Sequence, residues 1–236
     1  MAQSSQLSKI KKRLRDFASP EDAVFLQRFF KTGPGQYGEG DIFIGVRVPN
    51  TRIVAKEFST LPIEDIKALL KSPIHEERLL ALIILTIKFA NASVQIQKEI
   101  FEIYLSYTQY INNWDLVDVT VPHVVGAYLF ERPRSILQKM AKSNLLWDRR
   151  IAIVSTHYFI RHHDFSTTLN ISEMLLKDKE DLIHKATGWM LREVGKRNAD
   201  ILRSFLDKHG SIMPRTMLRY AIEKFTPEER KFYLNG

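Results

Sequence analysis

Residues 113–118 read Asn-Trp-Asp-Leu-Val-Asp and end at the middle of the chain. Asn113 or Asn112 is a good N-cap, so the sequence predicts that a helix opens here. Trp114 and Asp118 are four residues apart and would project from one face of that helix. An aromatic plane beside a carboxylate suits a flat, cationic ligand. On this stretch alone a packed tryptophan next to a solvated aspartate is the favoured interpretation, because tryptophan is usually buried.

Comparable openings, in which charged or aromatic residues precede an apolar segment, recur at intervals of about 30 to 36 residues, the length of a helix-pair repeat. They are Glu77-Arg78, Trp114-Asp115, Arg149-Arg150, His184-Lys185 and Arg215. Strand-like alternation is almost absent from residue 61 onward. The pattern predicts an all-α solenoid of degenerate HEAT-like repeats, because residue identity between the copies is poor. We expect one domain over residues 1–236, with N-terminal helices and a glycine-rich loop in 1–60 and helical repeats in 61–236.

The N-terminal part has clear local signals. Ser19-Pro20 is a typical helix start, with serine as the cap and proline at the first position. A glycine-rich loop follows at Gly33 to Gly45, and it lacks the Gly-Lys-Ser/Thr ending of a phosphate-binding loop. Pro49 is expected to begin another helix, which runs through Phe58.

Composition excludes several classes of protein. The 236 residues contain 44% apolar residues and no cysteine, so a substantial core is possible while disulfides and thiolate catalysis are excluded. The seven histidines form no helical metal-binding pattern. The sequence contains neither an apolar run long enough for a membrane helix nor an N-terminal signal segment, so we expect a cytoplasmic protein that does not contact membranes.

The chain is basic, with a net charge of +8 and a pI of about 9.6. Such an excess favours a polyanionic partner, most often nucleic acid. If the second helix of each repeat lines the inner face of the solenoid, one concave face collects Arg78, Arg149, Arg150, Lys185 and Arg215. Such a groove would suit a nucleic-acid backbone. Alternatively, these cations only solvate helix ends.

Four segments, taken in order, resemble the AlkD-type DNA alkylation-repair glycosylases. They are residues 113–118, Leu-Trp-Asp-Arg-Arg-Ile-Ala at 146–152, Lys-Ala-Thr-Gly-Trp-Met-Leu-Arg-Glu at 185–193, and Gly-Glu-Gly-Asp-Ile-Phe-Ile-Gly-Val-Arg-Val-Pro at 38–49. The resemblance implies a C-shaped, right-handed-type solenoid whose concave face holds duplex DNA. It also implies hydrolysis of the N-glycosidic bond of cationic alkylpurines, such as N3-methyladenine and N7-methylguanine, without a metal or organic cofactor. We expect a monomer.

The resemblance also implies roles for particular residues. Trp114 and Trp189 match the two tryptophans that pack against the deoxyribose and backbone of the lesion, and Asp118 matches the catalytic aspartate. Asp115 is expected to serve the helix N-terminus instead. The expected DNA contacts that come from the resemblance are Arg150, Arg52, Arg192 and Phe29.

The sequence departs from the family pattern at three places, one of which is the loop from Gly33 to Asp41, longer than in some members. Phe29 stands where the family has tyrosine, so a hydroxyl contact is missing, and Asp181-Leu182 replaces aromatic residues near the DNA. A HEAT-like paralogue that binds nucleic acid or a protein partner without chemistry is the alternative. The set Trp114, Asp118, Arg150 and Trp189 favours the enzyme, since a scaffold has no physical need for it.

Overall fold

A computed structural model of the chain describes residues 5–235. Within that range the structure has no β-strand, although an isolated parallel bridge joins Ile42 to Ile74. The predicted all-α class is confirmed. No helix in the described range is long and apolar enough to cross a membrane. The chain divides into two compact units: unit 1 ends at Thr120 and unit 2 begins at Val121.

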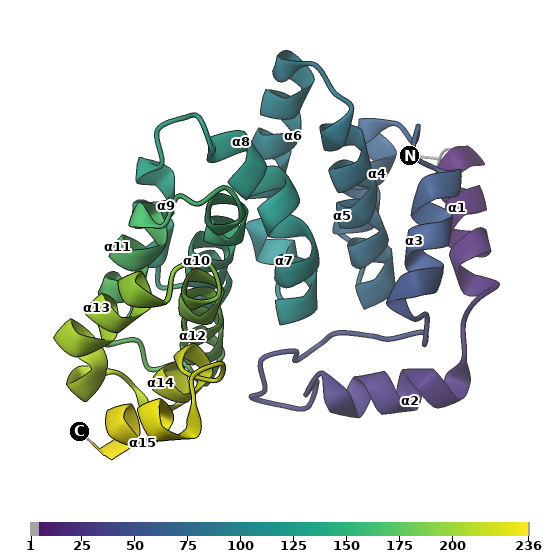
Figure 1. Cartoon of the computed structure of the whole chain (residues 1–236). Helices are drawn as coiled ribbons and strands as arrows, with labels where there is room; N and C mark the ends of the chain where they lie inside the picture. The colour runs from purple at the N-terminus through teal and green to yellow at the C-terminus, as the bar shows by residue number, and fades with distance from the viewer. Residues whose placement is uncertain (1–4, 236) are drawn as a thin grey trace. The chain divides into compact units, whose positions relative to one another are not determined.

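Unit 1 is built around the apolar helix α5, which packs against α3, α4 and α6, while α1 packs against α3 and α4. The helix α2 runs across the ends of these helices rather than beside them (Figure 1). Unit 1 comprises α1 (Ser5–Arg15), α2 (Pro20–Phe29), α3 (Val48–Glu57), α4 (Ile63–Leu70), α5 (His75–Ala90), α6 (Val94–Ser106), η1 (Thr108–Tyr110) and most of α7 (Trp114–Val121).

The N-terminal helices begin where local chemistry predicts. The side chain of Ser19 accepts a hydrogen bond from the backbone N–H of Asp22, and Pro20 occupies the first turn of α2. Proline suits this position because its fixed φ matches the helix and its missing N–H has no partner there. Pro49 likewise lies in the first turn of α3. Both predicted helix starts are confirmed, the second to within one residue.

Unit 2 consists of helix pairs in which α10 packs against η2 and α12, and α12 packs against α14. These helices approach closely at two glycines: a Cβ atom on Gly126 would lie 2.4 Å from the carbonyl oxygen of Ser155, and one on Gly188 would lie 2.4 Å from that of Met217. Unit 2 comprises η2 (Pro122–Gly126), α8 (Ala127–Leu129), α9 (Ser135–Ala141), α10 (Leu146–Arg161), α11 (Ser166–Met174), α12 (Asp181–Gly195), α13 (Ala199–His209), η3 (Gly210–Ile212), α14 (Arg215–Ala221) and α15 (Pro227–Asn235).

The turn that leads into α5 has a distinctive set of hydrogen bonds. The hydroxyl of Ser72 donates to the carboxylate of Glu77 at 2.7 Å and accepts the N–H of Ile74 at 3.1 Å. The guanidinium of Arg78 donates to the carbonyl oxygen of Ser72 at 2.9 Å. One serine therefore ties the turn to the first turn of the helix that follows.

The turn that leads into α10 repeats this arrangement. Ser143 donates to Asp148 at 2.8 Å and accepts the N–H of Leu145 at 3.1 Å, and Arg149 donates to the carbonyl oxygen of Ser143 at 3.0 Å. The charged openings found in the sequence are therefore structural repeats at these two helices. Their cations bind their own turns. The solenoid shape and the basic concave groove stay predictions.

Candidate active site

The first turn of α7 is held by the side chains that flank Trp114. Asn113 Oδ1 accepts the backbone N–H of Trp114 at 2.8 Å, and Asp115 Oδ1 accepts that of Leu116 at 2.9 Å. These oxygens take up N–H groups that have no partner in a preceding turn. The predicted helix start is confirmed, and Asp115 serves it as expected.

Trp114 is half-buried and is fixed on two sides. Its ring stacks on Phe30, with centroids 5.1 Å apart, and meets the edge of Phe29 at 6.0 Å. Its indole N–H donates to the hydroxyl of Tyr37 at 3.2 Å. The indole is thus neither a fully buried core residue nor a mobile surface group.

Asp118 lies one turn further along α7 and is half-buried. Burial and the negative charge of Asp118 raise the pKa of the Tyr104 phenol well above its usual value. The hydrogen bond with Thr120 lowers this pKa but does not cancel the rise. Tyr104 is fully buried, and its hydroxyl lies 2.7 Å from the hydroxyl of Thr120. Asp118 therefore sits beside a packed aromatic residue that remains protonated.

The second carboxylate oxygen of Asp115 contacts the buried His75. The distance from His75 Nε2 to Asp115 Oδ2 is 2.8 Å, and that from His75 Nδ1 to Asp41 Oδ2 is 3.1 Å. Burial on its own lowers the pKa of His75, but the charge and hydrogen bond of Asp115 and the hydrogen bond of Asp41 outweigh it and raise this pKa to about 9. The imidazole therefore carries a charge at neutral pH.

Asp41, from the glycine-rich loop, accepts hydrogen bonds from four side chains. Besides His75, these are Arg78 at 2.6 Å, Asn112 at 3.3 Å and Asn113 at 3.3 Å. Burial opposes the ionisation of Asp41, yet the hydrogen bond from His75 and the charge of Arg78 lower its pKa below the ordinary value. Asp41 is thus the anionic centre of a network that joins the loop to α5 and α7.

The end of the glycine-rich loop binds a carboxylate of the protein itself. Glu76 accepts the backbone N–H groups of Ile44, Gly45 and Val46 at 3.1, 2.8 and 3.2 Å. Gly45 has φ +81°, and a Cβ there would lie 2.0 Å from the carbonyl oxygen of Ser19, so glycine is required. Since these three amides bind Glu76, they are not available to a phosphate group.

Sequence reasoning did not single out Tyr37, Asp41 or His75. The sequence offered one partial signal, the polar run His75–Arg78 directly before the apolar segment of α5. In the structure every residue of this run is buried. Buried polar groups need partners. Their partners, Asp41 among them, lie too far along the chain for the sequence to mark them.

An apolar cavity of about 250 Å³ lies beside this network in unit 1. Aromatic rings from α2 and the loop, including Phe25, Phe29 and Phe43, form much of its wall, and His75 and Asp115 contribute to it as well. The side chains of Phe25 and Phe29 are 56% and 52% exposed. Helix α2 therefore has an exposed aromatic surface, formed by Phe25 and Phe29, next to Trp114.

In unit 2, Trp189 lies on α12 and is half-buried. Its ring is tilted against the imidazole of His157, with centroids 5.7 Å apart. Burial lowers the pKa of His157, so this ring is neutral at pH 7. Gly188, the residue before Trp189, lets α12 approach α14 closely. Trp114 and Asp118 belong to unit 1, so their joint action with Trp189 stays a prediction.

Several of the predicted DNA-contacting cations have partners within the protein. Arg78 is buried and bonded to Ser72, Asp41 and Asn112. Arg149 binds Asp178 at 2.6 Å, and the buried Arg150 donates to the carbonyl oxygen of Leu182 at 2.5 Å. Arg78 and Arg149 thus bind carboxylates of the protein itself, and the buried Arg78 does not solvate a helix end as the alternative interpretation has it.

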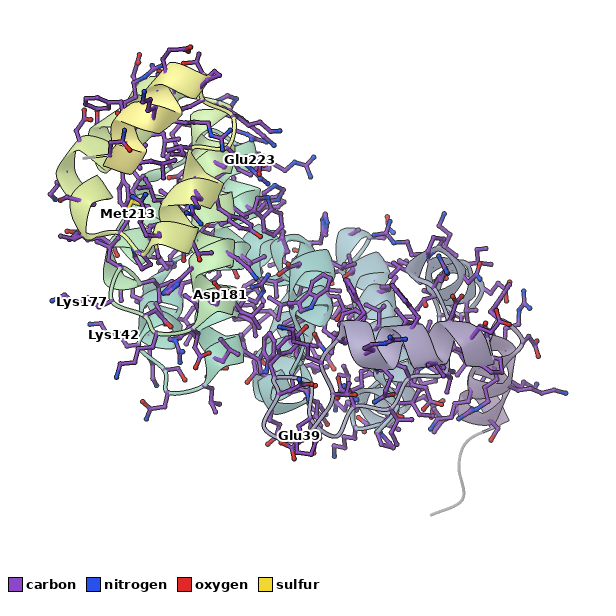
Figure 2. The ribbon with its side chains drawn as sticks, turned by 90° about the horizontal axis from the view of Figure 1, so that it is seen from below. Glu39, Lys142, Lys177, Asp181, Met213 and Glu223 are labelled. Atoms are coloured by element: carbon purple, nitrogen blue, oxygen red, sulfur yellow. The ribbon has the colours of Figure 1, made fainter. Side chains whose placement is uncertain are left out.

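The remaining predicted contacts are nearer the surface. Lys185 pairs with the exposed Asp181, labelled in Figure 2, at 2.7 Å. Arg192 pairs with Glu223, also labelled there. Arg52 is exposed on α3, and Phe29 is exposed beside Trp114. Of the predicted site residues, unit 1 therefore brings Phe29, Trp114 and Asp118 into one region.

Comparison with known proteins defines the class. A model of the DNA alkylation repair enzyme family matches residues 10–225, and the chain therefore belongs to this family. The expected resemblance is confirmed at the family level.

A solved structure described as a predicted DNA alkylation repair enzyme from Enterococcus faecalis is similar to this chain, with a TM-score of 0.70 at 17% identity. The match covers 89% of this chain and 97% of the other. At this identity the likeness supports the fold alone. No curated protein matched the sequence.

Proposed function

We propose that the protein is a DNA glycosylase that hydrolyses the N-glycosidic bond of cationic alkylpurines, such as N3-methyladenine and N7-methylguanine, in duplex DNA. Its membership of the DNA alkylation repair enzyme family supports a DNA substrate. The observation that carries the proposal is the pair on α7: a tryptophan fixed by Phe30 and Tyr37, with the half-buried Asp118 one turn further on.

The reaction needs no strong general acid, because the alkylated base is already an activated leaving group. A purine alkylated at N3 or N7 is positively charged, so it leaves as a neutral base when it takes the electron pair of the C1′–N bond. Positive charge then develops on the sugar, where a fixed carboxylate and aromatic faces stabilise it. Water adds to C1′ and loses a proton. In this proposal Asp118 stabilises the sugar and orients the water, while Trp114 and Trp189 contact the deoxyribose and backbone.

Binding uses the basic charge of the chain. In unit 1 the exposed Arg52 and Phe29 contact DNA. In unit 2 the DNA-contacting residues are Arg150, Arg192 and Lys185, and each of them leaves its partner in the protein to bind a phosphate group. Each phosphate contact releases condensed counterions, so affinity should fall steeply as salt rises. The protein acts on DNA as a monomer in this scheme.

The decisive experiment measures the release of free N3-methyladenine or N7-methylguanine from methylated duplex DNA. We expect release by the wild type and a loss of about 100-fold or more in the single-turnover rate of Asp118→Asn, with DNA affinity nearly unchanged. Asp200→Asn, at an exposed aspartate on α13, is the matched control and should keep the wild-type rate. The enzyme proposal fails if the wild type releases no base above background.

One observation favours a second candidate, a HEAT-like protein that binds nucleic acid or a protein partner without chemistry. Arg78 and Arg149 are bound to carboxylates of the protein, which reduces the cations available to a DNA backbone. DNA binding without base release would support this candidate for nucleic acid. Absence of salt-sensitive DNA binding would point to a protein partner.

A further inference from the structure

The glycine-rich loop, Gly33 to Gly45, has no part in the proposed chemistry, yet it is attached to the first turn of α7. Tyr37 accepts the indole N–H of Trp114 at 3.2 Å, and Asp41 accepts the side-chain amide of Asn113 at 3.3 Å. A third connection passes from Asp41 through His75 to Asp115. The loop and the helix that presents Trp114 and Asp118 are therefore joined as one assembly.

The central connection requires a doubly protonated histidine. Each ring nitrogen of His75 faces a carboxylate oxygen, Asp41 at 3.1 Å and Asp115 at 2.8 Å. An ionised carboxylate only accepts hydrogen bonds, while a neutral imidazole donates from one nitrogen alone. Both contacts are hydrogen bonds only when His75 is an imidazolium. Loss of its proton leaves one nitrogen lone pair opposite an anionic oxygen.

The two aromatic rings that cover His75 among the described residues donate no hydrogen bond in place of that proton. The ring of Phe43 stacks on the imidazole, with centroids 4.4 Å apart, and that of Phe30 is tilted over it at 5.3 Å. His75 is 1% exposed, so water does not reach it freely.

The charged groups that face His75 are Asp41 of the loop, Asp115 of α7 and Arg78 of α5. On α5, Glu76 is bound to backbone amides of the loop. With His75 charged, the two aspartates are balanced by two cations. Without that charge, Arg78 alone balances two buried carboxylates.

We propose that His75 is a positioning residue which, as an imidazolium, ties Asp41 of the glycine-rich loop to Asp115 and so holds the first turn of α7 where Trp114 and Asp118 serve excision. Phe30 completes the connection, because it packs against both His75 and Trp114. The excision part of this proposal rests on the proposed glycosylase function. The structural link between His75 and Trp114 does not.

The first test needs no substrate. In the DNA-free full chain, ¹⁵N NMR should show both ring nitrogens of His75 protonated at pH 7, with deprotonation near pH 9, the pKa that its partners impose. The indole N–H signal of Trp114, assigned by its absence from Trp114→Phe, should move over the same pH range. The proposal is overturned if His75 is a neutral tautomer at pH 7, or if the Trp114 signal does not move over the pH range in which His75 titrates.

The second test uses excision under single-turnover conditions. We expect His75→Gln to lower the rate by about 10- to 100-fold, as a misplaced active-site group does, while the Kd for methylated duplex changes less than about threefold. The wild-type rate should fall above pH 9, and the residual rate of His75→Gln should not. His162→Gln, at an exposed histidine on the other unit, is the matched control and should behave as wild type.

The outcomes separate the two proposals. If the wild type excises nothing, the glycosylase proposal fails, and the link between His75 and Trp114 is then tested by the NMR titration alone. If the wild type excises at a rate that stays level through pH 10, the positioning proposal fails while the glycosylase proposal stands. Should His75→Gln fail to fold, the wild-type pH profile and the NMR titration still decide.

Discussion

The indole N–H of Trp114 donates a hydrogen bond to the hydroxyl of Tyr37, 77 positions earlier in the chain, across 3.2 Å. The glycine-rich loop, for which the sequence predicted no role in the site, therefore contacts the tryptophan that the family resemblance expects to pack against the lesion. The contact fixes the rotation of the indole about its side-chain bonds, which stacking on Phe30 alone leaves less restricted. Orientation of this kind matters for an aromatic group that packs against a sugar.

Tyr37→Phe tests this contact directly. The substitution keeps the ring and removes one hydrogen bond, which is worth about 1 kcal/mol. We expect a fall of about three- to tenfold in the single-turnover excision rate and little change in the unfolding temperature. Tyr110→Phe is the matched control, because it removes the same hydroxyl group from a ring that packs on Tyr107. Equal rates for both variants would show that the Tyr37 hydroxyl is dispensable.

The pKa of His75 makes stability depend on pH. It is raised from 6.5 in the unfolded chain to about 9 in the fold, so the folded state binds this proton more tightly. The contribution is complete below pH 6.5 and is lost as the pH rises through 9. We expect the free energy of unfolding to fall by about 2 kcal/mol between pH 7 and pH 9.

Urea denaturation across this pH range measures the effect. Asp115→Asn removes the charge that does most to raise the pKa of His75 and should flatten most of the fall. The variant is also expected to be less stable at pH 7, because it leaves the buried His75 with one anionic partner instead of two. The same steep fall in this variant as in the wild type would assign the pH dependence to another group.

The features that the sequence predicted well are those set by neighbours in the chain. Ser19 and Pro20 specify the start of α2 through contacts within one turn, and Asn113 does the same for α7. The same cap and the four-residue spacing predicted that Trp114 and Asp118 lie on one face of that helix, and the family resemblance implied their roles. Such signals survive in a single sequence because the interacting groups are only a few residues apart.

The network around His75 could not be predicted in this way. Its two partners lie 34 and 40 positions away, so no local spacing marks them. Arg78 shows the complementary problem. A charged helix opening looks the same whether it faces DNA or a buried carboxylate, and here Asp41 binds it in the interior. Burial depends on tertiary packing, which the repeat spacing did not contain.

Gly188 is expected to be essential for the packing of α12 against α14. Alanine would improve helix propensity by about 1 kcal/mol. Its Cβ, however, would lie 2.4 Å from the backbone carbonyl oxygen of Met217, and neither backbone moves without disturbing a helix. Overpacking of this kind costs about 1–3 kcal/mol, so we expect Gly188→Ala to be destabilising overall.

Gly195→Ala in the same helix is a close control. There the added Cβ meets the terminal methyl group of Leu202 at 2.5 Å, which a rotation of that side chain relieves. We expect its free energy of unfolding in urea to stay near that of the wild type. If Gly188→Ala proved as stable as Gly195→Ala, the helices would have room that the structure does not show.

Arg52 offers the clearest measure of the DNA-binding surface, because it is exposed on α3 and its removal should disturb no internal contact. For a contact to one phosphate, Arg52→Ala should weaken binding to methylated and unmethylated duplex alike. It should also reduce the slope of log K against log salt by about 0.9. Fluorescence anisotropy over a salt series measures both quantities. Lys177→Ala, at an exposed lysine that projects from unit 2 (Figure 2), should leave the slope unchanged. Equal slopes for wild type and Arg52→Ala would remove Arg52 from the interface, since the lost charge would then release no counterion.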